Sequence, residues 1–122
     1  MDPMLNVAGL GGDDLRSLNV WLNEEPELQG GVTLLQRSPQ NGELPGGVLT
    51  GLAVALAPGG IAVVLARSLV SWLRRRPSGL SMKLTTPDGV TIEIESPGTR
   101  ASVDDIRRLI DRLIRFLEGG DR

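Results

Sequence analysis

Residues 44–66 contain no charged residue, and this stretch restricts the possible folds of the chain more than any other feature of the sequence. Such a segment must be buried in a protein core or meet a bilayer. Pro58, Gly59 and Gly60 interrupt it, and residues of these types end helices. We therefore predict that a central apolar segment over about residues 44–76 forms two helices with a break at these three residues.

Small residues recur within the first half of this segment. Gly47, Gly51 and Ala55 follow one another at four-residue spacing, which in a helix places them on one face. A face of small residues lets two helices approach closely. We predict that this face packs on another helix of the same chain or of a neighbouring copy, so that self-association is expected.

The end of the segment combines an aromatic residue with a basic run. Trp72 precedes Arg74, Arg75 and Arg76, and these residues are typical of a bilayer interface or a partner contact. They are equally typical of a core edge followed by a helix C-terminus, where cations are favoured. The uncharged run is nearly long enough to span a bilayer, but its break shortens each half. Membrane contact and a helical pair packed on a sheet therefore both remain open.

The clearest local structure is a hairpin. Apolar and polar residues alternate over residues 80–85 and again over residues 90–95, and Pro87, Asp88 and Gly89 form the loop between them. This loop pairs Leu84 with Ile92 and Met82 with Ile94, and it requires a positive φ at Gly89.

The remaining elements complete an α+β domain over residues 1–122. Short strands are predicted near residues 4–7 and 32–36, with an N-terminal helix between them. A last helix follows the capping residue Ser102, and its apolar stripe is expected to be buried against the sheet: Ile106, Leu109, Ile110, Leu113 and Leu117. The expected fold is a small split β-α-β-like sheet with a hairpin, packed by the N-terminal helix, the central apolar helical pair and the C-terminal amphipathic helix.

The residue types present argue against catalysis. The chain has no cysteine and no histidine, so thiolate chemistry and the usual zinc and haem ligands are missing. Its glycine clusters lack the lysine of a phosphate-binding loop. A net charge of −2 does not suggest affinity for nucleic acid. We predict a protein that is not an enzyme, has no cofactor and does not bind nucleic acid.

The order of short motifs resembles the effector-associated constant component family of small proteins from GC-rich bacteria. The matching motifs are DLRSL (14–18), WL (21–22) and EPEL (25–28), then LARSL (65–69), WL (72–73) and PDG (87–89). The resemblance implies a companion or adaptor encoded beside variable effectors, often peptidase-like, in bacterial conflict systems. It implies no catalytic residues.

Two other functions remain open at this point. One is a membrane-active effector that perforates the bilayer through residues 44–73, and the other is a soluble oligomeric scaffold. The N-terminal residues do not have the pattern of a secretory signal peptide. We therefore expect a cytoplasmic protein. Contact with the cytoplasmic membrane stays an alternative.

Overall fold

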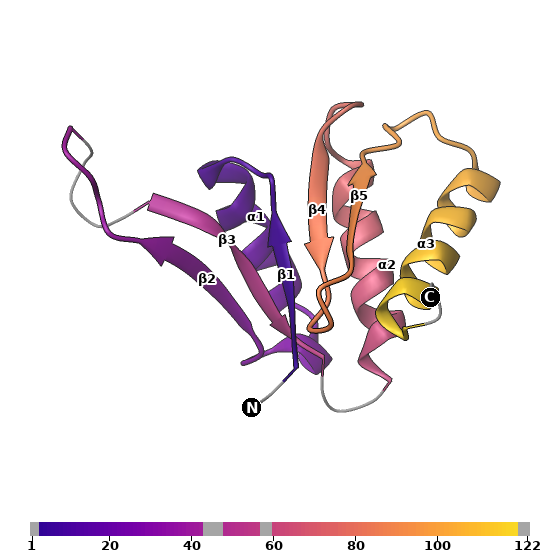
Figure 1. The fold of residues 1–122 in the computed structure, drawn as a ribbon. Coiled ribbons are helices and arrows are strands. Elements are labelled where there is room, and N and C mark those ends of the chain that lie inside the picture. Colours follow the sequence, from indigo (N-terminus) through magenta and orange to yellow (C-terminus); the bar gives the residue numbers. More distant parts are fainter. Residues whose placement is uncertain (1–2, 43–47, 57–59, 120–122) are drawn as a thin grey trace.

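The computed structural model describes residues 3–42, 48–56 and 60–119. The elements follow in this order (Figure 1): β1 (Met4–Ala8), α1 (Gly12–Asn23), a short 3-10 helix η1 (Pro26–Leu28), β2 (Val32–Arg37), β3 (Val48–Ala55), α2 (Ile61–Arg74), β4 (Ser81–Thr85), β5 (Thr91–Glu95) and α3 (Val103–Leu117). This is the α+β fold expected from the sequence.

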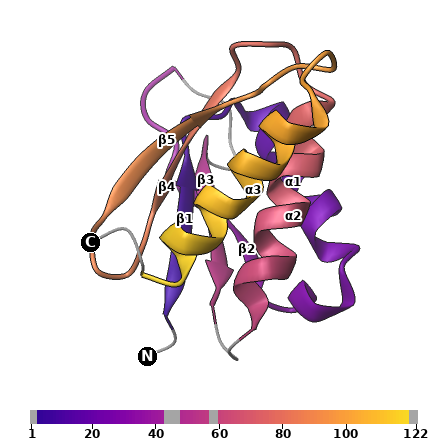
Figure 2. The ribbon, with the colours of Figure 1, turned by 90° about the vertical axis from the view of Figure 1, so that its right-hand side faces the viewer.

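The five strands form one antiparallel sheet in the order β2-β3-β1-β4-β5. The first six main elements have the β-α-β-β-α-β order of a split β-α-β sheet, and β5 extends it at one edge. All three helices lie on the same face, with α2 between α1 and α3 (Figure 2). The predicted split sheet is confirmed.

The core lies between that face and the helices. Successive side chains of a strand point to opposite faces, so Leu5 and Val7 of β1 are fully buried while Asn6 between them is exposed. Leu15, Leu18 and Leu22 follow helical spacing on the buried side of α1. Burying such a side chain contributes roughly 1.5–3 kcal/mol, an upper estimate because unfolded chains already bury some surface.

The prediction of a central helical pair is wrong in its first half. Residues 48–55 form β3, which is paired with β2 and β1. Leu52 and Val54 of this strand are fully buried. The reason for the error is geometric: residues four apart share a face both in a helix and in a strand, so small residues at that spacing fit either element.

The helix-packing role of the small residues is corrected accordingly. Gly51 pairs with Leu35 of β2, and Ala55 pairs with Met4 of β1. Gly60 directly precedes α2. Gly47, Pro58 and Gly59 lie outside the described residues.

The second half of the segment is helical, as predicted. In α2, Ile61, Leu65 and Leu69 are buried, whereas Arg67 and Ser71 are exposed. Most of the apolar residues of α2 thus lie in the core. Within the described ranges, no helix is both long enough and apolar enough to cross a membrane.

The hairpin has the predicted register. Leu84 pairs with Ile92 and Met82 with Ile94, and Gly89 has a φ of 88°. Helix α3 begins after Ser102, whose hydroxyl accepts a hydrogen bond from the backbone nitrogen of Asp105 over 3.1 Å. This cap was also expected from the sequence.

The burial of α3 differs from the prediction. The helix packs mainly beside α2 rather than on the sheet. Leu113 and Phe116 are buried, while Ile106, Leu109 and Ile110 are only partly so. In Figure 1, α2 lies behind β4 and β5 and α3 lies outside β5, and the buried residues of α3, Leu113 and Phe116, are both in its C-terminal half.

Candidate functional site

The basic run at the end of α2 is divided between two environments. Arg74 is the last residue of the helix and Arg75 is its cap, and both are exposed. Arg76 turns inward, with its side chain 28% exposed. The three arginines therefore do not act as one cluster.

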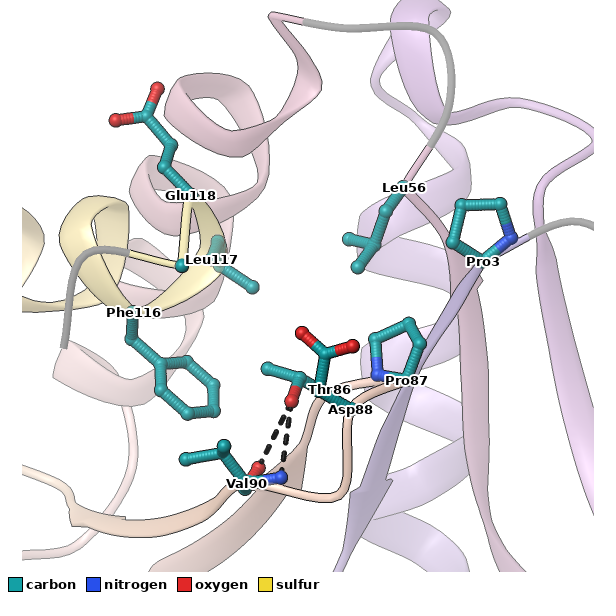
Figure 3. Close-up of a pocket in the computed structure, with 10 residues that line it drawn as sticks. Pro3, Leu56, Thr86, Pro87, Asp88, Val90, Phe116, Leu117 and Glu118 are labelled. Atoms are coloured by element: carbon teal, nitrogen blue, oxygen red, sulfur yellow. Dashed lines mark hydrogen bonds between the residues drawn. The ribbon is translucent and has the colours of Figure 1, made fainter. Parts of the chain in front are cut away.

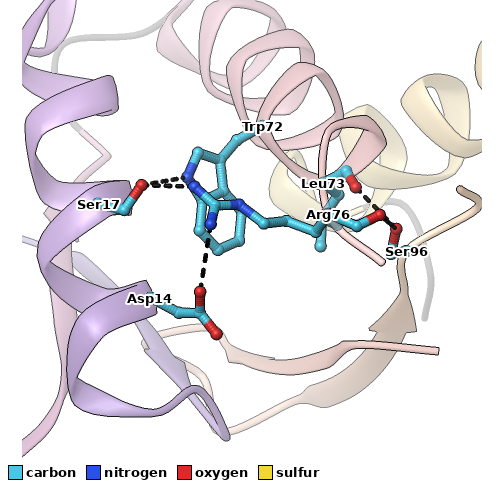
Figure 4. Close-up of polar contacts among 6 residues, drawn as sticks. All are labelled: Asp14, Ser17, Trp72, Leu73, Arg76 and Ser96. Atoms are coloured by element: carbon cyan, nitrogen blue, oxygen red, sulfur yellow. Dashed lines mark hydrogen bonds and ion pairs between the residues drawn. The ribbon is translucent and has the colours of Figure 1, made fainter. Parts of the chain in front are cut away.

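Arg76 joins α2 to α1 (Figure 4). Its Nη1 lies 3.3 Å from Oδ1 of Asp14, its Nη2 donates a hydrogen bond to Oγ of Ser17, and its guanidinium carbon lies 4.3 Å from the centre of the Trp72 ring. The ring nitrogen of Trp72 donates to the same Ser17 oxygen over 3.2 Å. Trp72 is 2% exposed, so the structure places it in the core and not at an interface. This cluster fixes the position of α1 relative to α2.

A buried hydroxyl supports the same end of α2. Ser96 donates a hydrogen bond to the carbonyl of Leu73 over 2.7 Å, and its oxygen lies 3.0 Å from the carbonyl oxygen of Arg76. It accepts a hydrogen bond from the nitrogen of Gly98 over 3.2 Å. The carbonyl groups that end a helix need such partners, so Ser96 holds the end of α2 to the segment after β5.

Trp21 is the aromatic residue that remains accessible. Its ring nitrogen donates to the carbonyl of Ser68 over 2.9 Å, and the ring is only partly buried. Arg75 lies over it, with its guanidinium carbon 4.7 Å from the ring centre. Val20 beside it is 58% exposed. The ring is thus held in place through its nitrogen, is covered in part by Arg75 and stays partly exposed.

Two shallow hollows share Trp21 in their lining. One, of about 370 Å³, is lined in part by Val20 and Arg75, and the other, of about 300 Å³, in part by Arg67. Both include Trp21 and Glu24. We call these five residues the Trp21 surface. Arg74, the remaining basic residue of the predicted site, lines an adjoining hollow of about 310 Å³.

The Trp21 surface has the composition of a protein contact. It places an aromatic ring and an exposed valine among charges of both signs: Glu24 is acidic, and Arg67 and Arg75 are basic. Tryptophan and arginine are the residue types that contribute most often to binding energy at protein interfaces. Across the part of the chain that the structure describes, no group of acidic residues is arranged to hold a metal ion.

Sequence reasoning missed the Trp21 surface. Trp21 lies at helical spacing from the buried residues Leu18 and Leu22 of α1, a pattern that is typical of a core residue. The usable signal was Val20, an apolar residue off that stripe and adjacent to a tryptophan. The stacking of Arg75 on Trp21 joins residues far apart in the sequence, so no local pattern could reveal it.

Comparison with known proteins identifies a family. No curated protein and no solved structure matches the chain. Residues 8–114 match the family described as Effector Associated Constant Component 1. The matched residues include α1, α2, the hairpin and all of the Trp21 surface, and they are most of the sequence. The chain therefore belongs to the family Effector Associated Constant Component 1.

Proposed function

We propose that this protein is a non-catalytic companion that binds an effector protein, and that the Trp21 surface is the point of contact. The observation that carries the proposal is the partly exposed ring of Trp21, which lines two hollows and lies next to exposed Val20. The family name supports an association with effectors. That the effector is peptidase-like is implied only by the resemblance.

The surface is rigid before any partner arrives. The Arg76 cluster joins α1 to α2, and Trp21 is bonded to the carbonyl of Ser68 in α2. A preformed surface loses less conformational entropy on binding. Arg75 is held over the ring, so its guanidinium can meet a carboxylate of the partner with two parallel hydrogen bonds.

Binding to the neighbouring effector gives the direct test. The protein is co-purified with the effector encoded beside it, and affinity is measured by isothermal titration calorimetry for Val20→Arg and Arg75→Glu. Both residues are exposed, so the variants should fold normally. Affinity is expected to fall about tenfold or more, as for central interface residues.

The matched control is Val103→Arg. Val103 is 72% exposed at the start of α3, outside the Trp21 surface. The Val103→Arg variant should bind the effector with the same affinity as the unchanged protein. If all three variants bind equally well, the Trp21 surface is not the contact.

The absence of catalysis belongs to the same proposal. A serine nucleophile needs an adjacent base, and the sequence has no histidine to serve as one. It also has no cysteine, so a thiolate nucleophile is missing. The purified protein is expected to hydrolyse no peptide, ester, nucleotide or phosphodiester. A turnover that survives rigorous purification and is lost on one carboxylate substitution would overturn this.

The membrane-active alternative depends on the apolarity of residues 44–73. Burial of Leu52, Val54 and Leu65 in the core accounts for much of that apolarity and favours the companion function over a pore. Flotation with anionic vesicles tests membrane contact, and light scattering tests self-association. Vesicle binding that survives Arg74→Gln together with Arg75→Gln would favour the membrane-active alternative.

A further inference from the structure

A second concave site is shown in Figure 3. It is a cavity of about 330 Å³ where the end of β3, the β4–β5 turn and the end of α3 come together. Its apolar lining comes from these segments and the start of β1: Pro3, Leu56, Pro87, Val90, Phe116 and Leu117.

The floor of the cavity is buried, and part of its wall is exposed. Phe116 is 2% exposed and anchored in the core, whereas Val90 is 45% exposed. The backbone around Val90 is fixed, because its carbonyl accepts a hydrogen bond from the nitrogen of Thr86 over 2.9 Å and its nitrogen donates to the Thr86 hydroxyl over 3.2 Å. The cavity is thus formed before any ligand binds.

Among the described residues that line the cavity, both charged ones are acidic. They are Asp88 and Glu118, and the described lining includes no lysine or arginine. Both carboxylates are exposed, and neither forms an ion pair with a described residue. Exposed apolar surface next to unpaired carboxylates is complementary to a ligand that is both apolar and cationic.

We propose that this cavity binds one large apolar side chain of a linear segment of a partner protein, with a lysine or arginine next to that side chain. The volume lies at the lower end of the roughly 300–1,000 Å³ typical of ligand pockets, which suits a single leucine, methionine or phenylalanine. The cation lies against Asp88 or Glu118, whose carboxylates stand apart in Figure 3. This inference is independent of the Trp21 surface, which other elements form.

Synthetic peptides provide the probe. A short peptide with a central leucine between two lysines is titrated into the full-length, ¹⁵N-labelled protein. The amide signals of Val90, Glu118 and Gly119 are expected to shift, and those of Trp21 and Arg75 to stay in place. Replacing the leucine by serine, or both lysines by glutamates, should abolish the shifts.

Substitutions separate the two parts of the proposal. Asp88→Asn combined with Glu118→Gln should weaken binding about threefold to tenfold, because each exposed ion pair contributes little. Val90→Lys should abolish binding of the peptide, because it places a cation at the mouth of the cavity. The charge-matched control, Glu27→Gln with Glu95→Gln, changes exposed carboxylates on other elements and should leave binding unchanged.

Several outcomes would overturn the inference. They are an absence of shifts up to millimolar peptide, equal binding of the glutamate peptide, or an equal loss of affinity in the control variant. Since neither the effector nor the Trp21 surface enters this experiment, its failure would leave the proposed function untouched.

Discussion

The backbone of Gly51 in β3 lies so close to Val7 of β1 that a Cβ atom at position 51 would be 2.5 Å from the Val7 carbonyl oxygen. Gly51→Ala is therefore expected to push the two strands apart and to lower the free energy of unfolding by roughly 1–3 kcal/mol. Urea denaturation measures the change. Gly12→Ala is the control, because its added Cβ meets only the end of Arg16 at 3.6 Å in the first turn of a helix. It should be as stable as the unchanged protein or more so. Equal losses in both variants would contradict close packing of β3 on β1.

Gly89 gives a second stability prediction. Its φ of 88° lies in the left-handed region, where a β-branched residue is strained. Gly89→Val should cost about 1–3 kcal/mol, measured by thermal melting. Gly89→Asn should be milder, because asparagine tolerates this region. If the two variants melt alike, the turn differs from the one described.

The two halves of α3 should respond differently to truncation. Leu113 is fully buried, so Leu113→Ala should cost roughly 2–5 kcal/mol. Leu109 is only partly buried, and Leu109→Ala should cost clearly less. Chemical denaturation of both variants tests this ranking, and the reverse ranking would mean that the N-terminal half of α3 is the anchored one.

The role of Arg76 can be separated from that of its neighbour. Arg76→Met keeps an unbranched stem over Trp72 but removes the ion pair with Asp14 and the hydrogen bond to Ser17, and should cost about 1–3 kcal/mol. Arg74→Met changes an exposed residue and should stay within about 0.5 kcal/mol of the unchanged protein. The measurement is the free energy of unfolding in urea. Similar values for the two variants would show that the Arg76 contacts add no stability.

Features that depend on residues close together in the sequence could be predicted from it. The hairpin register follows from the turn chemistry of Pro87, Asp88 and Gly89, and the start of α3 follows from Ser102. Residues 48–55 could not be assigned in the same way. A short uncharged run with small residues four apart satisfies both the helical and the strand pattern, and only its pairing with β1 and β2 makes it a strand.

The candidate sites were less predictable because they combine distant segments. Arg74, Arg75 and Arg76 look alike in the sequence, and only the position of α1 decides that Arg76 turns toward Asp14 while Arg75 covers Trp21. The apolar cavity joins residues from Pro3 to Gly119, and no sequence pattern relates them.

The central place of β1 also has a consequence for biosynthesis. Both of its neighbours, β3 and β4, come much later in the chain, so β1 leaves the ribosome well before either partner exists. Pairing between distant segments is slow compared with local structure. A nascent chain that has completed β3 but not β4 carries β1 with one unpaired edge, and such edges are prone to pair with other chains. In the folded protein, pairing of β1 with β4 of the hairpin covers this edge.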